Sequence, residues 1–206
     1  MIDVYFGPTA NGYRATLAME ECGLPYRLHK LDLAKGESHT PEYLKVNPAG
    51  MIPAIVDSDG PGGKPFTLTQ SAAIILYAAE KSGRFVPKDP VTRWVALQWL
   101  MQATSDVAGT SGALFRIDNS IPDKTPGNSE YFQKRLINFF RDCDRQLEGR
   151  DFLAGEISVA DLMLYPGFVA RKALLDSAGG LANLQRWAAT MAARPAVQRG
   201  MNPAAV

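Results

Sequence analysis

Hydrophobic periodicity changes once along the chain, near residue 85, and this change restricts the fold more than any other feature. Before it, short segments of alternating apolar and polar residues are separated by segments with apolar residues at three- and four-residue spacing. Alternation is typical of half-buried strands, and the longer spacing is typical of amphipathic helices. After residue 90 only the helical spacing recurs. We therefore expect an α/β domain at 1–83, a proline-containing linker, and an all-helical domain at 90–206.

The order of elements within the first domain indicates one fold. The predicted elements are strands at 2–6, 26–33, 52–57 and 65–68 and helices at 11–22, 40–44 and 71–81. A helix between the first two strands favours their parallel pairing. The Gly, Asp and Pro residues of 58–64 favour a hairpin between the last two strands. The resulting order, β-α-β-α-β-β-α, is that of the thioredoxin fold.

The second domain is predicted to be a helical bundle. Its expected helices are 91–104, 131–147, 159–177 and 181–193. Pro122 and Pro126 favour a loop over 117–128. Ser158 and Asp161 have the spacing of a capping box. We interpret this hydroxyl and acid as a device that starts a helix, not as a catalytic pair.

The charge balance argues against several classes of partner. Lys and Arg number 22 and Asp and Glu number 21, with no long basic cluster of the kind that nucleic-acid-binding proteins carry. The apolar run at 72–79 is far shorter than the roughly 18–20 residues of a membrane-spanning helix. The first residues lack the basic and apolar regions of a secretory signal. We therefore expect a cytoplasmic protein with no nucleic-acid or membrane partner.

Cysteine and histidine are too scarce for a disulfide framework or a metal site. The chain has two cysteines, Cys22 and Cys143, and two histidines, His29 and His39. Cys22 lies within a predicted helix beside apolar residues, so we expect its thiol to be buried and unreactive. No metal cofactor is expected.

Neutral hydrogen-bond donors follow the first predicted strand. Residues 8–12 read Pro-Thr-Ala-Asn-Gly. A helix N-terminus favours an anion, and the Thr9 hydroxyl and the Asn11 amide can both donate a hydrogen bond to one. A thiolate would suit this position. In the alternative interpretation, Thr9 and Asn11 only cap the helix.

Two further segments carry groups that suit a peptide-like ligand. Pro53 heads a predicted strand, where its missing N–H is tolerated. Gln70 and Ser71 lie at the start of a predicted helix. Ser71 could hold a carboxylate and the Gln70 carbonyl could accept from an ammonium group, which together match a free amino-acid terminus. Alternatively, Ser71 caps the helix and Gln70 faces solvent.

Together these segments resemble the glutathione transferases, and among them the bacterial Nu class. The resemblance covers nearly all of the first domain and thins in the second. The matching segments are Pro8-Thr9-Ala10-Asn11-Gly12, Lys35-Gly36-Glu37-Ser38, Pro41-Glu42-Tyr43-Leu44, Asn47-Pro48, Ile52-Pro53-Ala54-Ile55-Val56, Gln70-Ser71 and Ala79-Glu80-Lys81-Ser82-Gly83.

The resemblance implies a glutathione site in which Thr9 and Asn11 are the catalytic residues and face the sulfur. It implies that Pro53 is cis and that the Ile52 backbone pairs with the cysteinyl main chain. The γ-glutamyl end would be held by Gln70 and Ser71. The glutathione-binding residues implied in this way are Ser38, Met51, Ile52, Pro53, Gln70 and Ser71.

Three departures from the class pattern are present. Gln70 replaces a Glu, which removes a negative charge near the γ-glutamyl ammonium. Gly50 and Met51 replace an Asn-Lys type pair, which removes a cation near the glycyl carboxylate. The third departure lies beyond Met101, where the Gly-rich segment of the class gives way to residues 102–115. Within the implied site, Ser38 stands where the class usually has a Gln that reaches the glycyl end.

The resemblance also implies the kind of reaction. The expected function is transfer of activated glutathione to small electrophiles. Glutathione-dependent reduction of disulfides or peroxides is the alternative, and a non-catalytic glutathione-binding module is a further one. Members of the family are typically homodimers. Tyr13, Phe115 and Phe168 are expected to line the second-substrate pocket. Several animal classes of the family use a Tyr near the first strand to contact the thiol. Tyr5 of this chain lies inside the predicted strand, a position that favours packing in the core over contact with a ligand.

Overall fold

The computed structural model describes residues 1–122 and 125–203, which form two compact units. The first unit contains Met1–Val86 and the chain from Ala192 onward, and the second contains Pro87–Met191. The elements of the first unit are β1 (Ile2–Phe6), α1 (Ala10–Cys22), β2 (Tyr26–Lys30), η1 (Glu37–His39), α2 (Pro41–Val46), β3 (Ala54–Asp57), η2 (Pro61–Gly63), β4 (Phe66–Thr69), α3 (Ser71–Ser82) and α10 (Pro195–Gly200).

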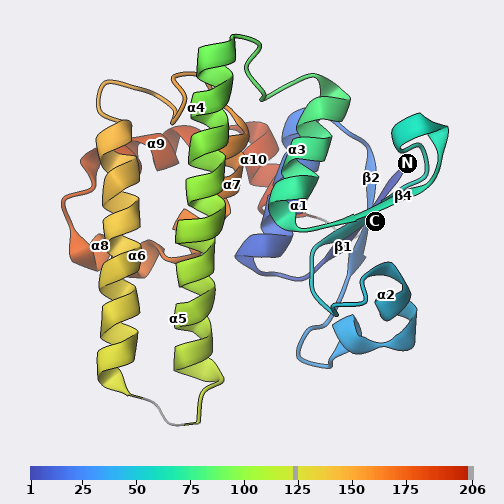
Figure 1. The fold of residues 1–206 in the computed structure, drawn as a ribbon, viewed down its shortest axis with the longest axis horizontal. Coiled ribbons are helices and arrows are strands. Elements are labelled where there is room, and N and C mark those ends of the chain that lie inside the picture. Colours follow the sequence, from blue (N-terminus) through green and yellow to red (C-terminus); the bar gives the residue numbers. More distant parts are fainter. Residues whose placement is uncertain (123–124, 204–206) are drawn as a thin grey trace. The chain divides into compact units, whose positions relative to one another are not determined.

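A four-stranded sheet in the order β2-β1-β3-β4 organises the first unit (Figure 1). β1 pairs with β2 in parallel, and β3 pairs with both β1 and β4 in antiparallel fashion. The thioredoxin-like element order, the parallel first pair and the hairpin of the last two strands are therefore confirmed. The second strand ends at Lys30, three residues before the predicted end.

Alternation along β1 decides which face of the strand is buried. Ile2, Val4 and Phe6 are at most 3% exposed, whereas Asp3 and Tyr5 point to the other face and are half-buried. Helices α1 and α3 contact each other. Leu17 of α1 and Ile74 of α3 are completely buried. Apolar burial of this kind contributes about 25 cal/mol per Å² and is the main force that holds helices on a sheet.

The C-terminal segment, from Ala192 onward, packs on α1, although it falls within the helical domain predicted at 90–206. The Thr16 hydroxyl donates to the Gly200 carbonyl at 2.6 Å, and Arg194 donates two hydrogen bonds to Glu21 at 2.6 and 2.8 Å. Gly200 approaches α1 so closely that a Cβ there would lie 2.6 Å from the Leu17 Cα. These contacts explain why the segment belongs to the first unit.

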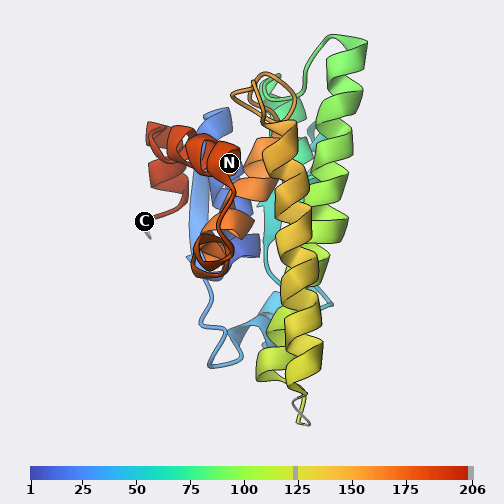
Figure 2. The ribbon, with the colours of Figure 1, turned by 90° about the vertical axis from the view of Figure 1, so that its left-hand side faces the viewer.

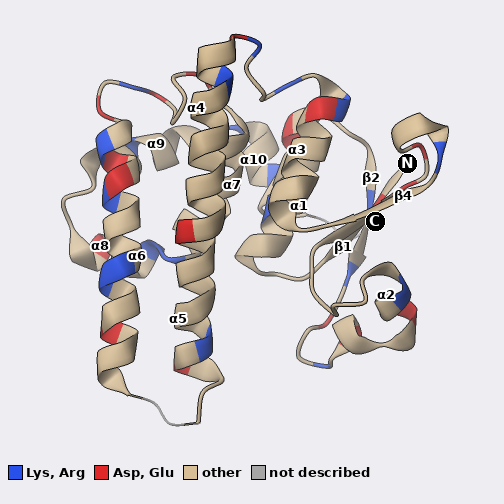
Figure 3. Ribbon diagram, in the orientation of Figure 1, with Lys and Arg blue, Asp and Glu red and all other residues tan. Residues whose placement is uncertain are grey.

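The second unit is helical. Its elements are α4 (Pro90–Met101), η3 (Gln102–Ala108), α5 (Gly109–Asn119), α6 (Pro126–Gln146), α7 (Val159–Ala170), α8 (Lys172–Ala178) and α9 (Ala182–Ala192). Both views show α5 and α6 lying side by side (Figures 1 and 2). Charged residues of both signs are interspersed along α6 (Figure 3). Within the described residues, no helix is long and apolar enough to cross a membrane.

Three predictions in this unit are wrong. The helix predicted at 159–177 is two helices, α7 and α8, which are separated at Arg171. The helix predicted at 91–104 continues through the π-helical segment η3 into α5 and ends at Asn119. The loop predicted at 117–128 is consequently shorter, and Pro126 begins α6 as its first residue, a position that proline favours. Residues 123 and 124 of that loop lie outside the described residues. The predicted capping box at Ser158 is present.

Candidate functional site

Three loops of the first unit meet at one edge of its sheet. Tyr5 pairs with Ala54, and Ala54 pairs with Thr69, so one row of residues crosses β1, β3 and β4. Because β3 runs antiparallel to both neighbours, the end of β1, the start of β3 and the end of β4 share an edge. The candidate residues at 9–11, 51–53 and 70–71 follow or precede these strand ends. The structure therefore brings the three segments to one place.

Thr9 caps α1 and keeps a proton to donate. Its Oγ1 accepts a hydrogen bond from the Gly12 N–H at 3.3 Å, so Thr9 is the N-cap of α1, whereas Asn11 makes no capping bond among the residues that the structure describes. A hydroxyl that accepts still has its own O–H. Within the described residues, the N–H groups of Ala10 and Asn11 have no hydrogen-bond partner, as is usual in the first turn of a helix. The start of α1 thus offers several donors to an anion.

Asn11 is exposed and held by its neighbour. The Arg14 guanidinium donates through Nη1 to the Asn11 Oδ1. The amide oxygen is therefore engaged with the protein, and no described residue accepts from the amide nitrogen. This arrangement leaves the two N–H bonds of Asn11 for a ligand.

Two glycines allow the loop before α1 to lie against the helix. A Cβ at Gly12 would lie 2.0 Å from the Gly7 carbonyl oxygen. A Cβ at Gly7 would lie 2.8 Å from the Leu33 side chain. A side chain at Gly12 would force the backbone apart, and one at Gly7 would displace the Leu33 side chain. Glycine at both positions therefore fixes where Thr9 and Asn11 stand.

The segment before β3 is fixed through the Met51 carbonyl. This oxygen accepts from the Tyr43 hydroxyl at 2.5 Å and from the Asn47 side-chain amide at 2.6 Å. The Ile52–Pro53 peptide bond is cis, as expected. The Met51 side chain is 53% exposed. Tyr43 and Asn47 support this segment, a role that their place among the segments resembling the family did not indicate.

Gln70 adopts a backbone conformation that is rare for a residue other than glycine. Its φ is 71° and its ψ is 115°, at the position before α3. Such a conformation costs on the order of 1–3 kcal/mol and is found most often at ligand-binding sites. Ser71 is the first residue of α3, and its side chain has no partner among the described residues. The predicted capping bond from Ser71 is therefore not formed, and Ser71 stays available to a ligand.

Ser38 lies apart from solvent in the short turn η1. It is 6% exposed, and its carbonyl faces Gly50. Gly50 has a φ of 64°, and a Cβ there would lie 2.3 Å from the His39 ring. The departure to glycine at position 50 is thus explained by the packing of His39.

The Tyr5 ring packs against neighbouring rings of the first unit. Its ring stacks on His29 at 4.7 Å between centroids and lies 5.5 Å from the Tyr43 ring. Burial raises the pKa of Tyr5, and the nearby Asp3 carboxylate adds to this rise. His29 in turn lies 2.7 Å from Asp3. These contacts support the choice of Thr9 and Asn11 over Tyr5.

The residues expected to bind the second substrate have different environments. Tyr13 belongs to the first unit and packs edge-on against Phe6 at 5.2 Å. Phe115 belongs to the second unit and is 59% exposed. Phe168 is 3% exposed and packs against Phe140 and Trp187. Phe168 is therefore a core residue of the second unit in this structure.

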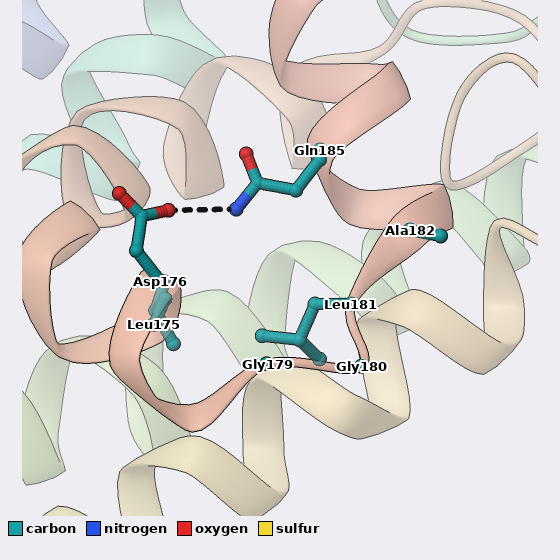
Figure 4. Close-up of a pocket in the computed structure, with 7 residues that line it drawn as sticks. All are labelled: Leu175, Asp176, Gly179, Gly180, Leu181, Ala182 and Gln185. Atoms are coloured by element: carbon teal, nitrogen blue, oxygen red, sulfur yellow. Dashed lines mark hydrogen bonds between the residues drawn. The ribbon is translucent and has the colours of Figure 1, made fainter.

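The hollow drawn in Figure 4 does not belong to the candidate site. It has a volume of about 330 Å³ and lies wholly within the second unit, between α8 and α9. Asp176 and Gln185 are joined across it by a hydrogen bond of 3.0 Å. Its walls carry few polar groups, and the candidate residues at the sheet edge belong to the other unit. The chemistry at the sheet edge is the better guide to function.

Both cysteines are inert in this arrangement, and this leads to a prediction. Cys22 is 5% exposed and Cys143 is completely buried. Burial raises the pKa of each thiol. A thiol reagent should modify neither cysteine in the native protein and both after denaturation, as absorbance of the released chromophore would report. Rapid native labelling of one thiol would contradict this account. Among the described residues, no cluster suited to a metal ion is present.

Comparisons with known proteins agree with the geometry. A family model described as the N-terminal domain of glutathione S-transferase matches residues 10–81. The disulfide-bond oxidoreductase YfcG of Escherichia coli is 39% identical over 168 residues, which cover 81% of this chain and 78% of that protein.

Solved structures are similar over nearly the whole chain. A glutathione transferase from Pseudomonas putida, with one glutathione disulfide bound per subunit, has a TM-score of 0.88 and 32% identity over 98% of this chain and 91% of its own. A glutathione transferase from Burkholderia graminis, with two glutathione molecules bound per subunit, has a TM-score of 0.88 and 32% identity over 98% and 88%.

Proposed function

The chain belongs to the glutathione S-transferase family, and from this premise we propose that it activates glutathione as a thiolate at Thr9 and Asn11 and uses it to reduce disulfide bonds. The observation that carries the proposal is the group of neutral donors at the start of α1. A thiol with a pKa of about 8.5 is only a few per cent ionised at neutral pH. Lowering its pKa by two units takes about 2.7 kcal/mol, which two donors and a helix N-terminus can supply.

The spacing of the three loops supports a tripeptide as the ligand. Neighbouring strands lie about 4.8 Å apart, so the row across β1, β3 and β4 spans roughly 10 Å. A γ-glutamyl-cysteine unit, with its extended side-chain linkage and its cysteine side chain, can follow this row, and the glycyl residue continues beyond it. In this arrangement the sulfur faces Thr9 and Asn11, the cysteinyl main chain meets Ile52, and the γ-glutamyl end reaches Gln70 and Ser71. Ser38 and Met51 flank the glycyl end.

Disulfide reduction takes its electrons from glutathione. The bound thiolate attacks one sulfur of the substrate disulfide, which breaks the S–S bond, forms a mixed disulfide and releases a thiolate. A second glutathione thiolate attacks the mixed disulfide and gives glutathione disulfide and the second product thiol. The buried Cys22 and Cys143 do not serve as redox centres. One relative named a disulfide-bond oxidoreductase supports this reaction, as do two similar structures that hold a glutathione disulfide or two glutathione molecules per subunit.

A comparison of two substrates tests the proposal. Turnover of bis(2-hydroxyethyl) disulfide with glutathione should greatly exceed turnover of a chlorodinitrobenzene-type electrophile, and a Cys22→Ser/Cys143→Ser variant should retain it. Turnover of the electrophile alone would favour the second candidate, glutathione transfer, which uses the same thiolate. Binding to immobilised glutathione with turnover of neither substrate would favour a non-catalytic glutathione-binding module.

A further inference from the structure

The buried guanidinium of Arg14 contacts the exposed side chain of Asn11. Arg14 follows Asn11 by three residues on α1, so both side chains lie on the same face of the helix. Arg14 is 2% exposed, and its Nη1 donates to the Asn11 Oδ1. Burial lowers the pKa of this guanidinium to about 10, which leaves it charged at neutral pH.

The orientation of the Asn11 amide decides whether it attracts or repels an anion. The oxygen and nitrogen ends of an asparagine amide are nearly equal in shape, so a half-turn about the last torsion exchanges them. With the nitrogen outward the amide donates to a thiolate, and with the oxygen outward it repels one. A guanidinium has only donors, so it bonds the oxygen end and never the nitrogen end.

We propose that Arg14 is a positioning residue, which holds the Asn11 amide with its nitrogen facing the glutathione sulfur. This inference rests on the proposed function, since it concerns the same sulfur site. Arg14 does not touch the ligand. A hydrogen bond from a cation to the amide oxygen also polarises the amide, which strengthens its N–H donors. The positive charge thus acts on the thiolate through Asn11.

The chain contains a matched pair that serves as a control. Arg141 donates to the Asn138 Oδ1 at 3.1 Å, again three residues apart on a helix. Both residues are exposed and belong to the second unit. Substitutions of this pair test what the loss of such a bond does outside the first unit.

Substituting Arg14 by lysine or by glutamine distinguishes an effect on the orientation of the Asn11 amide from an effect on packing alone. Arg14→Lys keeps a donor-only group, whereas Arg14→Gln can offer either a donor or an acceptor to Asn11. We measure the ionised fraction of bound glutathione at neutral pH by ultraviolet absorbance, together with kcat and KM for glutathione. Arg14→Gln should lower the ionised fraction and kcat by at least about threefold, a common size of coupling between bonded neighbours, with little change in KM. Arg14→Lys should restore most of the loss, and Arg141→Gln should have no effect.

Arg14→Lys and Arg14→Gln are also compared in an Asn11→Ala background, which completes the test. Because Arg14 acts through Asn11, lysine and glutamine at position 14 should there give equal ionised fractions. Arg14 also makes a further interaction, so thermal unfolding is followed in each variant to separate stability from activity. An equal loss with and without Asn11, or equal values for lysine and glutamine in the presence of Asn11, would overturn the positioning role. If Asn11→Ala alone changes nothing, the sulfur site itself fails; if only the position 14 effect is missing, the proposed function stands without this inference.

Discussion

Asn11→Ala is expected to raise the apparent pKa of bound glutathione by about one to two units and to lower turnover near neutral pH by roughly threefold to twentyfold, as the ionised fraction falls. A hydrogen bond to a charged group contributes about 1.5–3 kcal/mol, and one pKa unit corresponds to 1.36 kcal/mol. Asn11 is one of two side chains that donate at the start of α1 in this account. Its loss therefore removes a substantial share of the preference for the thiolate.

The measurement is an ultraviolet titration of the thiolate in the glutathione complex. Asn138→Ala is the matched control, because Asn138 has the same kind of arginine partner and lies in the other unit. Its titration should coincide with that of the unsubstituted protein. If Asn11→Ala binds glutathione and titrates unchanged, Asn11 does not act on the sulfur.

Asp161→Asn is expected to lower the free energy of unfolding by about 3–5 kcal/mol. Asp161 is completely buried and accepts four hydrogen bonds. One carboxylate oxygen accepts from the Leu153 N–H at 3.1 Å and the Trp187 indole N–H at 2.9 Å. The other accepts from the N–H and the hydroxyl of Ser158 at 2.9 and 3.1 Å. Asparagine can serve only one of these two pairs, because its NH₂ group faces donors at the other.

Loss of one partner in such a network is costly, because buried donors are left without acceptors. Burial raises the pKa of Asp161 to about 6, while the four donors act against this rise. Urea unfolding gives the free energy directly. Asp176→Asn is the control, since Asp176 is an exposed carboxylate of the same unit, and its unfolding midpoint should hardly change. A similar small change for Asp161→Asn would show that the network does not hold the second unit together.

The fold of the first unit could be predicted because local signals and tertiary packing agree there. The strand of Ile2, Val4 and Phe6 alternates cleanly, and glycine ends both α1 and α3 in the left-handed conformation. Local sequence alone was enough to place the turns.

The second unit shows where local signals fail. A π-helical segment spans Gln102–Ala108, and its wider turn shifts the hydrophobic pattern that identifies a helix. Thr104 and Ser105 donate back to carbonyls four residues earlier, at 2.7 and 2.9 Å. Such polar residues resemble a loop in sequence. The continuation of the helix to Asn119 was therefore missed.

The sequence predicted the candidate ligand-binding residues but not the residues that hydrogen-bond to them. Thr9, Asn11 and Ser71 lie at predicted helix starts, where local sequence is enough to identify hydrogen-bonding groups. Arg14 could not be singled out, because nothing in the sequence shows that it is buried against Asn11. The two donors to the Met51 carbonyl were missed for the same reason. Contacts between side chains depend on three-dimensional packing, which a single sequence does not display.

A crystal structure of the protein with glutathione bound tests the central claim most directly. The account predicts the sulfur within hydrogen-bond distance of the Thr9 Oγ1 and the Asn11 Nδ2, with the Arg14 guanidinium still on the Asn11 Oδ1. A sulfur placed against other residues, or a sheet edge filled by the protein's own side chains, would contradict it.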